Sequence, residues 1–179
     1  MFSTGERDCD HMKTSKIQLI TFDFDGVFTD NSVLLDEAGM EYVRCSRADG
    51  LAIDAFKKIG IKTLVLSTEK NQVVAARAKK LGMPVISGCG NKLRSLTEYC
   101  AINLISIDNV CYVGNDVNDF YVMQECGFSC CPADSHQSIV EIASVVLETA
   151  GGRGVARELA EKVFGLDIKK ILFDGELKK

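Results

Sequence analysis

Tryptophan is absent from this chain of 179 residues, and proline and histidine are scarce, with two of each. No apolar run approaches the roughly 20 residues that a membrane-spanning helix needs, so no such helix is expected. Basic residues do not predominate: 21 Lys and Arg stand against 25 Asp and Glu, a formal net charge of −4, which makes nucleic-acid binding a poor hypothesis. Hydrophobic residues are abundant, at 46%, which is enough for one compact domain.

The eight cysteines include no C-x-x-C pair, and no Cys/His spacing supplies the four ligands of a structural zinc site. Residues 1–16 are polar and lack the apolar core of a signal peptide, so we expect a loose N-terminal tail and a cytoplasmic protein. In that compartment the cysteines are expected to be free and mostly buried thiols. We expect the domain to span 17–166, followed by a C-terminal tail at 167–179 that either docks into an active site or frays.

Short apolar runs rich in β-branched residues alternate with segments of helical periodicity. We expect strands at 17–23, 61–66, 84–86, 110–113, 128–130 and 145–147. We expect helices near 49–58, 70–81, 91–100, 117–126, 136–143 and 153–164. This alternation predicts an α/β fold: a doubly wound, Rossmann-like parallel sheet with helices on both faces.

One segment interrupts the alternation. Residues 32–35 and 41–45 are strand-like and are separated by the turn-forming residues 36–39, which predicts a β-hairpin flap inserted after the first strand. No stretch is long enough for a cap domain. Because ligands of doubly wound sheets bind beyond the carboxyl ends of the strands, we expect the functional residues where each strand ends.

Asp23 and Asp25 follow the first predicted strand. Residues two apart on an extended chain point the same way, so both carboxylates can face one site before Gly26 lets the backbone turn. An isolated D-x-D is more often an acidic loop that caps a helix. The apolar strand before it and the D-G-V-x-T-D continuation favour a functional site instead.

Polar residues follow three further strands. Ser67 and Thr68 could donate hydrogen bonds to an anion, or one of them could cap the next helix. Lys92 follows a glycine-containing loop and could serve the site or be a solvated surface charge. Asn115 and Asp116 begin an N-D-V-N-D segment, whose oxygen ligands suit Mg²⁺, although an acidic helix N-terminus would look similar.

The order of these four motifs, an aspartate pair, a hydroxyl, a lysine and an acidic loop, resembles the signature of the haloacid dehalogenase superfamily over about 17–166. The hairpin, the missing cap, Gly90-Asn91-Lys92 and the A-G-G-R-G segment at 150–154 resemble its cap-less branch of octulosonate 8-phosphate and sialic-acid-type 9-phosphate phosphatases. The resemblance implies a Mg²⁺-dependent phosphomonoester hydrolase of a small phosphorylated 2-keto-3-deoxy sugar acid. It also implies a homotetramer in which the hairpin covers the neighbouring site.

Residue roles follow from the same resemblance. Asp23 is the nucleophile that forms an aspartyl-phosphate, and Asp25 is the general acid and base. The expected Mg²⁺ ligands are Asp23, the Asp25 main-chain carbonyl, Asn115 and Asp116, with Asp119 ranked behind them. The residues expected to bind the phosphoryl group or the sugar are Ser67, Lys92, Gly26, Thr68, Arg153 and Arg47.

Three departures from the family pattern bear on the substrate. Asn115 stands where the family has an aspartate, Ser67-Thr68-Glu69 replaces T-G-R, and Arg47 is displaced by one position. The last two favour the sialic-acid-type side of the branch. Asn115 and the Ser67-Thr68-Glu69 segment motivate an alternative hypothesis, a catalytically weak or inactive tetramerisation module related to the C-terminal domain of CMP-sialate synthetases. The retained Asp23, Asp25 and Lys92 favour the enzyme.

Overall fold

The computed structural model describes residues 14–174, so the predicted N-terminal tail at 1–16 lies almost wholly outside the described residues. Six strands form one parallel sheet in the order β5-β4-β1-β6-β7-β8. The strands are β1 (Leu19–Phe22), β4 (Lys62–Leu66), β5 (Val85–Ile86), β6 (Val110–Val113), β7 (Phe128–Cys131) and β8 (Val145–Val146). Each overlaps a predicted strand, and the predicted parallel α/β fold is confirmed.

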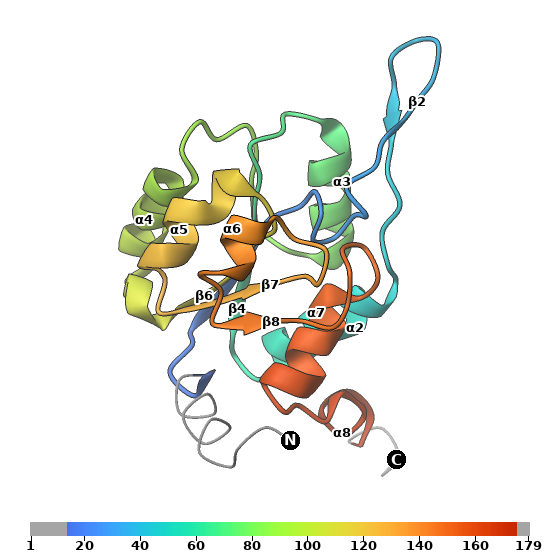
Figure 1. The fold of residues 1–179 in the computed structure, drawn as a ribbon. Helices are drawn as coiled ribbons and strands as arrows, with labels where there is room; N and C mark the ends of the chain where they lie inside the picture. The colour runs from blue at the N-terminus through green and yellow to red at the C-terminus, as the bar shows by residue number, and fades with distance from the viewer. Residues whose placement is uncertain (1–13, 175–179) are drawn as a thin grey trace.

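Helices cover both faces of the sheet (Figure 1). One face carries α2 (Ala48–Lys58), α3 (Gln72–Leu81), α7 (Val155–Glu158), which continues as a π-helix (Leu159–Val163), and α8 (Ile168–Phe173). The other carries α4 (Lys92–Asn103), α5 (Phe120–Glu125) and α6 (Gln137–Val140). Side chains alternate along β1: Ile20 and Phe22 pack into the first core, and Leu19 packs into the second.

The ends of several helices differ from the predicted ranges. The segment predicted at 70–81 begins at Gln72, because the Asn71 side chain caps it by accepting a hydrogen bond from Val73 N at 3.1 Å. The alternative that Ser67 or Thr68 caps this helix was therefore wrong. The segment predicted at 117–126 divides into a 3₁₀ turn, η2 (Val117–Asp119), and α5. A second 3₁₀ turn, η1 (Ile107–Asn109), precedes β6.

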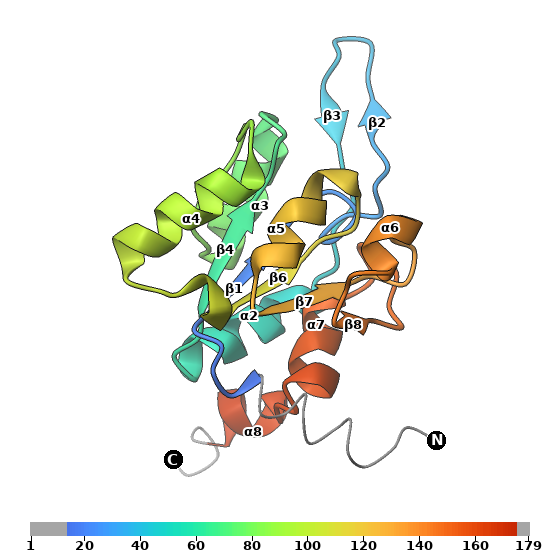
Figure 2. The ribbon, with the colours of Figure 1, turned by 60° about the vertical axis from the view of Figure 1, so that its left-hand side comes forward.

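The described part of the C-terminal tail packs on its own domain. Ile168 in α8 is 4% exposed and joins the core beside α2. Leu172 O accepts a hydrogen bond from Lys58 Nζ at 3.2 Å. Figure 2 shows α8 at the end of the molecule away from the hairpin. Within residues 14–174 no helix combines the length and the apolar character needed to cross a bilayer.

The predicted hairpin is confirmed as β2 (Leu34–Leu35) and β3 (Glu41–Tyr42), which pair antiparallel. Asp36 closes the turn, because its carboxylate accepts hydrogen bonds from Ala38 N at 2.9 Å and Met40 N at 2.8 Å. The hairpin projects well beyond the rest of the molecule (Figure 2). It leaves the domain directly after the loop that follows β1, so it starts beside the carboxyl ends of the strands.

Asp49 is a buried carboxylate that links two helices. Its Oδ1 accepts a hydrogen bond from Ala156 N at 3.0 Å, and its Oδ2 is buried with no partner among residues 14–174. Burial raises the pKa of Asp49 from an ordinary value of 3.8 to about 6, although the Ala156 N–H and Arg77 oppose the shift. At mildly acidic pH, Asp49 is therefore still protonated in the folded state but already ionised in the unfolded state.

We expect Asp49→Asn to change how stability depends on pH. Because the folded-state pKa is raised, ionised Asp49 costs free energy at neutral pH, and that cost disappears as the pH falls through about 6 toward about 4. The asparagine variant should therefore gain stability over the wild type at neutral pH and lose that advantage near pH ~4. Urea unfolding of both proteins across this range measures the difference. A difference that is independent of pH would contradict the prediction.

Candidate active site

The order of the sheet strands reverses between β1 and β6. The chain runs outward from β1 through β4 to β5, and then outward in the other direction from β6 through β7 to β8. Such a switch point leaves a crevice at the carboxyl ends of the strands, where doubly wound sheets bind ligands. A cavity of about 170 Å³ lies there. It is lined by Asp23, Asp25, Asn31, Ser67, Thr68, Glu69, Asn115, Asp116 and Asn118.

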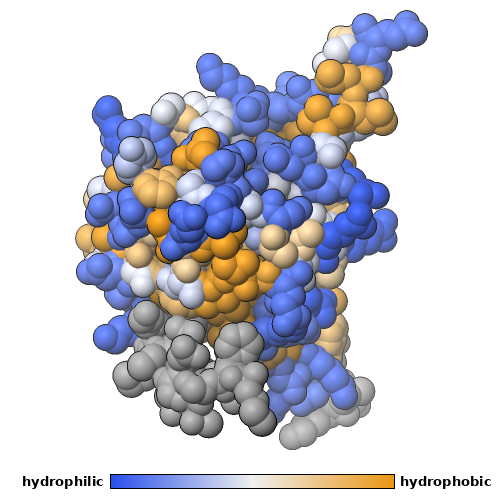
Figure 3. Space-filling view, in the orientation of Figure 1, coloured by the Kyte–Doolittle hydropathy of each residue, from blue (hydrophilic) through white to orange (hydrophobic). Residues whose placement is uncertain are grey.

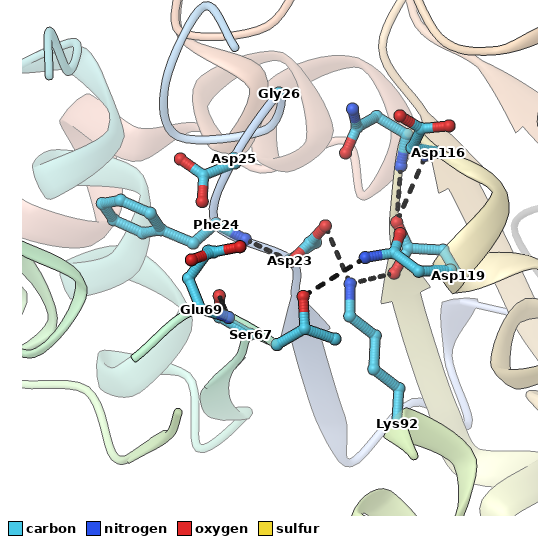
Figure 4. A network of polar contacts seen from close by, with 12 residues as sticks. Asp23, Phe24, Asp25, Gly26, Ser67, Glu69, Lys92, Asp116 and Asp119 are labelled. Atoms are coloured by element: carbon cyan, nitrogen blue, oxygen red, sulfur yellow. Dashed lines mark hydrogen bonds and ion pairs between the residues drawn. The ribbon is translucent and has the colours of Figure 1, made fainter. Parts of the chain in front are cut away.

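Asp23 lies at the end of β1 and is 5% exposed. Its Oδ1 accepts a hydrogen bond from Phe24 N at 2.8 Å, and its Oδ2 forms an ion pair with Lys92 Nζ at 2.8 Å (Figure 4). Burial and the neighbouring Asp119 raise the pKa of Asp23 to about 8, while Lys92 opposes the shift. The Asp23 carboxylate faces the cavity, and the Lys92 ammonium only partly offsets the effects of burial and of Asp119 on its charge.

Lys92 is 3% exposed, so the alternative that it is a solvated surface charge was wrong. Its Nζ also forms an ion pair with Asp119 Oδ1 at 2.6 Å, and the lysine lies between two carboxylates (Figure 4). Asp23 and Asp119 raise the pKa of Lys92 although burial, the largest single influence, acts to lower it. Asp119, which the sequence ranked last among the candidate metal ligands, is therefore the ion-pair partner of Lys92 in the structure. The spacing of the N-D-V-N-D segment was its only signal.

Asp25 lies on the loop after β1 and also lines the cavity. Thr29 Oγ1 donates to Asp25 Oδ1 at 3.3 Å and accepts from Gly26 N at 3.2 Å, so the threonine fixes the turn of this loop. Burial raises the pKa of Asp25, as do Glu69 and Glu41, while the Thr29 hydroxyl lowers it. Thr29 was not predicted as a site residue, although the T of D-G-V-x-T-D is a signal for it.

Gly26 has a φ of +77°, a left-handed backbone conformation that glycine adopts without strain. A Cβ at this position would overlap the side-chain amide of Asn115. The glycine therefore lets the loop after β1 come close to the loop after β6. That approach places the Asp23 and Asn115 side chains in one cavity.

The hydroxyl segment follows β4 along another wall of the cavity. Ser67 is 1% exposed, and its Oγ accepts a hydrogen bond from Glu69 N at 3.1 Å, which leaves the hydroxyl hydrogen free to be donated. Thr68 Oγ1 accepts from Asn118 Nδ2 at 3.5 Å, a long contact between two walls. The exposed Glu69 adds a further acidic group to the cavity.

The residues of the cavity fit a hard metal cation. The Asn115 side chain is 7% exposed, and its Oδ1 is buried with no hydrogen-bond partner among residues 14–174. Asp23 and Asp116 line the same cavity, and oxygen donors of this kind suit Mg²⁺. Within the described chain no three His, Cys, Asp or Glu side chains group as a metal site. A cation here would therefore depend on the Asn115 amide oxygen and on main-chain carbonyls.

Asp116 has a second, structural role. Its side chain accepts a hydrogen bond from Val117 N at 2.7 Å and takes part in a capping box with Asp119 at the start of η2. Asp116 therefore caps the start of η2, as expected of an acidic helix N-terminus, and also lines the cavity.

Four of the residues predicted to bind the phosphoryl group or the sugar lie outside the cavity lining: Gly26, Lys92, Arg47 and Arg153. Arg47 is exposed just before α2, and Arg153 is exposed in the loop before α7, where it acts electrostatically on Asp30. Asp30 itself forms an ion pair with Arg44 at 2.5 Å. Among residues 14–174 no lysine or arginine lines the cavity, and Lys92 contacts the Asp23 carboxylate from within the fold.

Comparison with known proteins gives consistent matches. Residues 57–159 match the family described as haloacid dehalogenase-like hydrolase. The 3-deoxy-D-manno-octulosonate 8-phosphate phosphatase KdsC of Escherichia coli strain K12 is 31% identical over 150 residues, which cover 83% of this chain and 80% of that protein. A Streptomyces avermitilis MA-4680 structure described as a HAD family hydrolase has a TM-score of 0.83 and 41% identity, covering 87% of this chain and 95% of that chain. A 3-deoxy-D-manno-octulosonate 8-phosphate phosphatase from Moraxella catarrhalis, solved with magnesium ion, phosphate ion and KDO, has a TM-score of 0.86 and 25% identity, covering 96% and 97% of the two chains.

Proposed function

The chain belongs to the haloacid dehalogenase-like hydrolase family and is a phosphatase, and we propose that it hydrolyses a small phosphorylated 2-keto-3-deoxy sugar acid. The first candidate substrate is 3-deoxy-D-manno-octulosonate 8-phosphate, on which the named relatives act. One observation carries the proposal: Asp23, Asp25 and Ser67 face a single cavity at the switch point of the sheet. Lys92 contacts Asp23 directly.

In the proposed reaction, an oxygen of Asp23 attacks phosphorus, and the bond from phosphorus to the sugar oxygen breaks. The product of this step is an aspartyl-phosphate on Asp23. Water then attacks phosphorus, which releases inorganic phosphate and restores the carboxylate. The Ser67 hydroxyl and the Lys92 ammonium donate to the phosphoryl oxygens, where negative charge develops.

Asp25 is the proposed general acid and base. Its raised pKa favours the protonated carboxyl, which can give its proton to the leaving sugar oxygen in the first step. The resulting carboxylate then takes a proton from the attacking water. Thr29 holds the Asp25 side chain through its hydroxyl, so that both transfers start from a fixed carboxyl position.

A bound Mg²⁺ would offset the repulsion between the phosphate dianion and Asp23. We propose that Asp23, the Asp25 main-chain carbonyl, Asn115 and Asp116 hold this ion. The partnerless Asn115 Oδ1 supports its part in the set. The amide brings no charge, so the site should hold the cation less tightly than an all-carboxylate site.

We expect Asn115→Asp to tighten Mg²⁺ binding by roughly tenfold, because a charged oxygen replaces a neutral one at a buried position. Isothermal titration of the protein with Mg²⁺ alone measures the dissociation constant. Asn118→Asp is the matched control, since it adds the same charge to another wall of the cavity. Equal tightening in both variants would show that overall charge, rather than the Asn115 position, sets the affinity.

Phosphate release with Mg²⁺ from a panel of substrates tests the proposed function. The panel contains octulosonate 8-phosphate, sialic-acid-type 9-phosphates and ordinary sugar phosphates. We expect kcat/KM for octulosonate 8-phosphate to exceed that for ordinary sugar phosphates by a factor of about 100 or more. Preference for a 9-phosphate would support the second candidate substrate, a sialic-acid-type 9-phosphate, which the acidic Glu69 in the cavity favours. A folded protein inactive on every compound would support the tetramerisation module instead.

The hairpin is the proposed assembly element, and we propose a homotetramer in which it covers the neighbouring site. Its apolar side chains are exposed, among them Leu34 at 70%, Leu35 at 60% and Met40 at 59%. Figure 3 shows this apolar surface on the projecting hairpin. Exposed apolar clusters of this kind are typical of protein interfaces.

We also propose a cytoplasmic location. It is supported by the free thiols of Cys45, Cys89, Cys100, Cys111, Cys126 and Cys131.

We expect the double variant Leu34→Asp, Leu35→Asp to dissociate the assembly, because it places charges in the apolar surface of the hairpin. Sedimentation velocity should show smaller particles, and kcat/KM for the sugar phosphate should fall because each site loses its cover. Leu104→Asp is the control, since Leu104 is 92% exposed on a different part of the molecule. An assembly that survives the double variant would contradict the proposed role of the hairpin.

A further inference from the structure

Tyr112 is a buried tyrosine that the proposed mechanism does not use. It lies in β6 with no exposed surface, and its hydroxyl donates to Asp119 Oδ1 at 2.8 Å. A buried phenol hydroxyl needs a partner, and here the partner is the carboxylate that binds Lys92. A phenylalanine would fill the same space, so packing alone does not account for the hydroxyl.

The Asp119 carboxylate is held from four directions. Its Oδ1 accepts from Lys92 Nζ at 2.6 Å and from the Tyr112 hydroxyl. Its Oδ2 accepts from Asn115 N at 2.9 Å and, more weakly, from Asp116 N at 3.4 Å. Four donors match the four lone-pair sites of a carboxylate, so the group has one fixed orientation.

The position of Asp119 Oδ1 in turn governs Lys92. The lysine side chain is 1% exposed, and its Nζ is shared between Asp119 at 2.6 Å and Asp23 at 2.8 Å (Figure 4). Asp119 Oδ1 also accepts the hydrogen bond from the Tyr112 hydroxyl, so its negative charge is shared between two donors. This sharing weakens the attraction between Asp119 and the Lys92 ammonium. Without the hydroxyl, the oxygen would have only Lys92 as a donor and would compete more strongly with Asp23 for the ammonium.

We propose that Tyr112 is a positioning residue of the catalytic site, whose hydroxyl holds Asp119 so that Lys92 Nζ stays within reach of Asp23. The proposal rests on the proposed function in taking Asp23 as the nucleophile. It assigns no contact between Tyr112 and the substrate. Its effect should therefore appear in the rate of the chemical step and not in substrate binding.

Tyr112→Phe tests the proposal, with Tyr99→Phe as the matched control. Tyr99 is partly buried and packs against the same core, so the control removes a phenol hydroxyl away from Asp119. With para-nitrophenyl phosphate as substrate, we expect Tyr112→Phe to lower kcat by about tenfold and to leave KM within about twofold. We expect Tyr99→Phe to leave both constants near those of the wild type.

A second readout does not depend on turnover. The Lys92 ammonium gives a proton–nitrogen NMR signal when its hydrogens are held, and Lys92→Met assigns it. Because the contact between the ammonium and Asp23 would then loosen, we expect these hydrogens to exchange with water several times faster in Tyr112→Phe than in the wild type or in Tyr99→Phe. A wild type that hydrolyses no phosphomonoester would refute the proposed function, and the exchange comparison would still decide the role of Tyr112. Unchanged kcat and unchanged exchange, even with a lower thermal midpoint, would reduce Tyr112 to a packing residue.

Discussion

The Asp23→Asn variant should lose phosphate release by a factor on the order of 10⁴ or more, because an asparagine amide cannot form the aspartyl-phosphate of the proposed reaction. Asparagine has nearly the same shape, so it keeps the hydrogen bond from Phe24 N through its amide oxygen. Burial raises the pKa of Asp23 to about 8, so the ionised carboxylate costs the metal-free fold free energy at neutral pH. The thermal midpoint of the metal-free variant should therefore not fall.

The control for this result is Asp54→Asn, which makes the same chemical change at an exposed position of α2. We expect it to keep the activity and stability of the wild type. Continuous phosphate release at saturating substrate measures the first property, and thermal unfolding measures the second. Activity in Asp23→Asn above about one hundredth of the wild-type value would exclude Asp23 as the nucleophile.

The Lys92→Met variant should lose both stability and activity. Methionine fills much of the space but leaves Asp23 and Asp119 buried without their shared cation. Removing one partner of a buried ion pair typically costs about 3–5 kcal/mol of unfolding free energy. Loss of a donor to the transition state should lower kcat by a further factor of about 10²–10³.

Urea unfolding and steady-state kinetics measure the two effects of Lys92→Met separately. Lys79→Met is the control, because Lys79 is exposed on α3 and its replacement should change neither quantity appreciably. A free energy of unfolding within about 0.5 kcal/mol of the wild type would contradict the buried cluster that the structure describes.

The strands could be predicted from the sequence, because six short apolar runs overlap the six parallel strands of the sheet. The hairpin could be predicted too, since Asp36 and Gly39 mark its turn. Helix ends were predicted less well. The start of α3 depends on which polar side chain caps it, and Asn71 does so, five residues after β4 ends.

The cavity was predictable in outline because the carboxyl ends of parallel strands meet at one edge. Asp23, Ser67 and Asn115 come from three different strand ends and line one cavity. The partners of Lys92 were not predictable, because Asp119 is 27 residues away in the chain and meets it only after folding. Arg47 and Arg153 lie on loops, whose course no periodicity in the sequence defines.

Trapping the phosphorylated enzyme tests the central claim most directly. The wild type is mixed with octulosonate 8-phosphate and Mg²⁺ and quenched in acid during the first turnover, and its peptides are analysed by mass spectrometry. The proposed mechanism predicts one added phosphoryl group on the peptide that carries Asp23, and none in Asp23→Asn. A phosphoryl group on another residue, or release of phosphate with no phosphorylated peptide at any quench time, would contradict it.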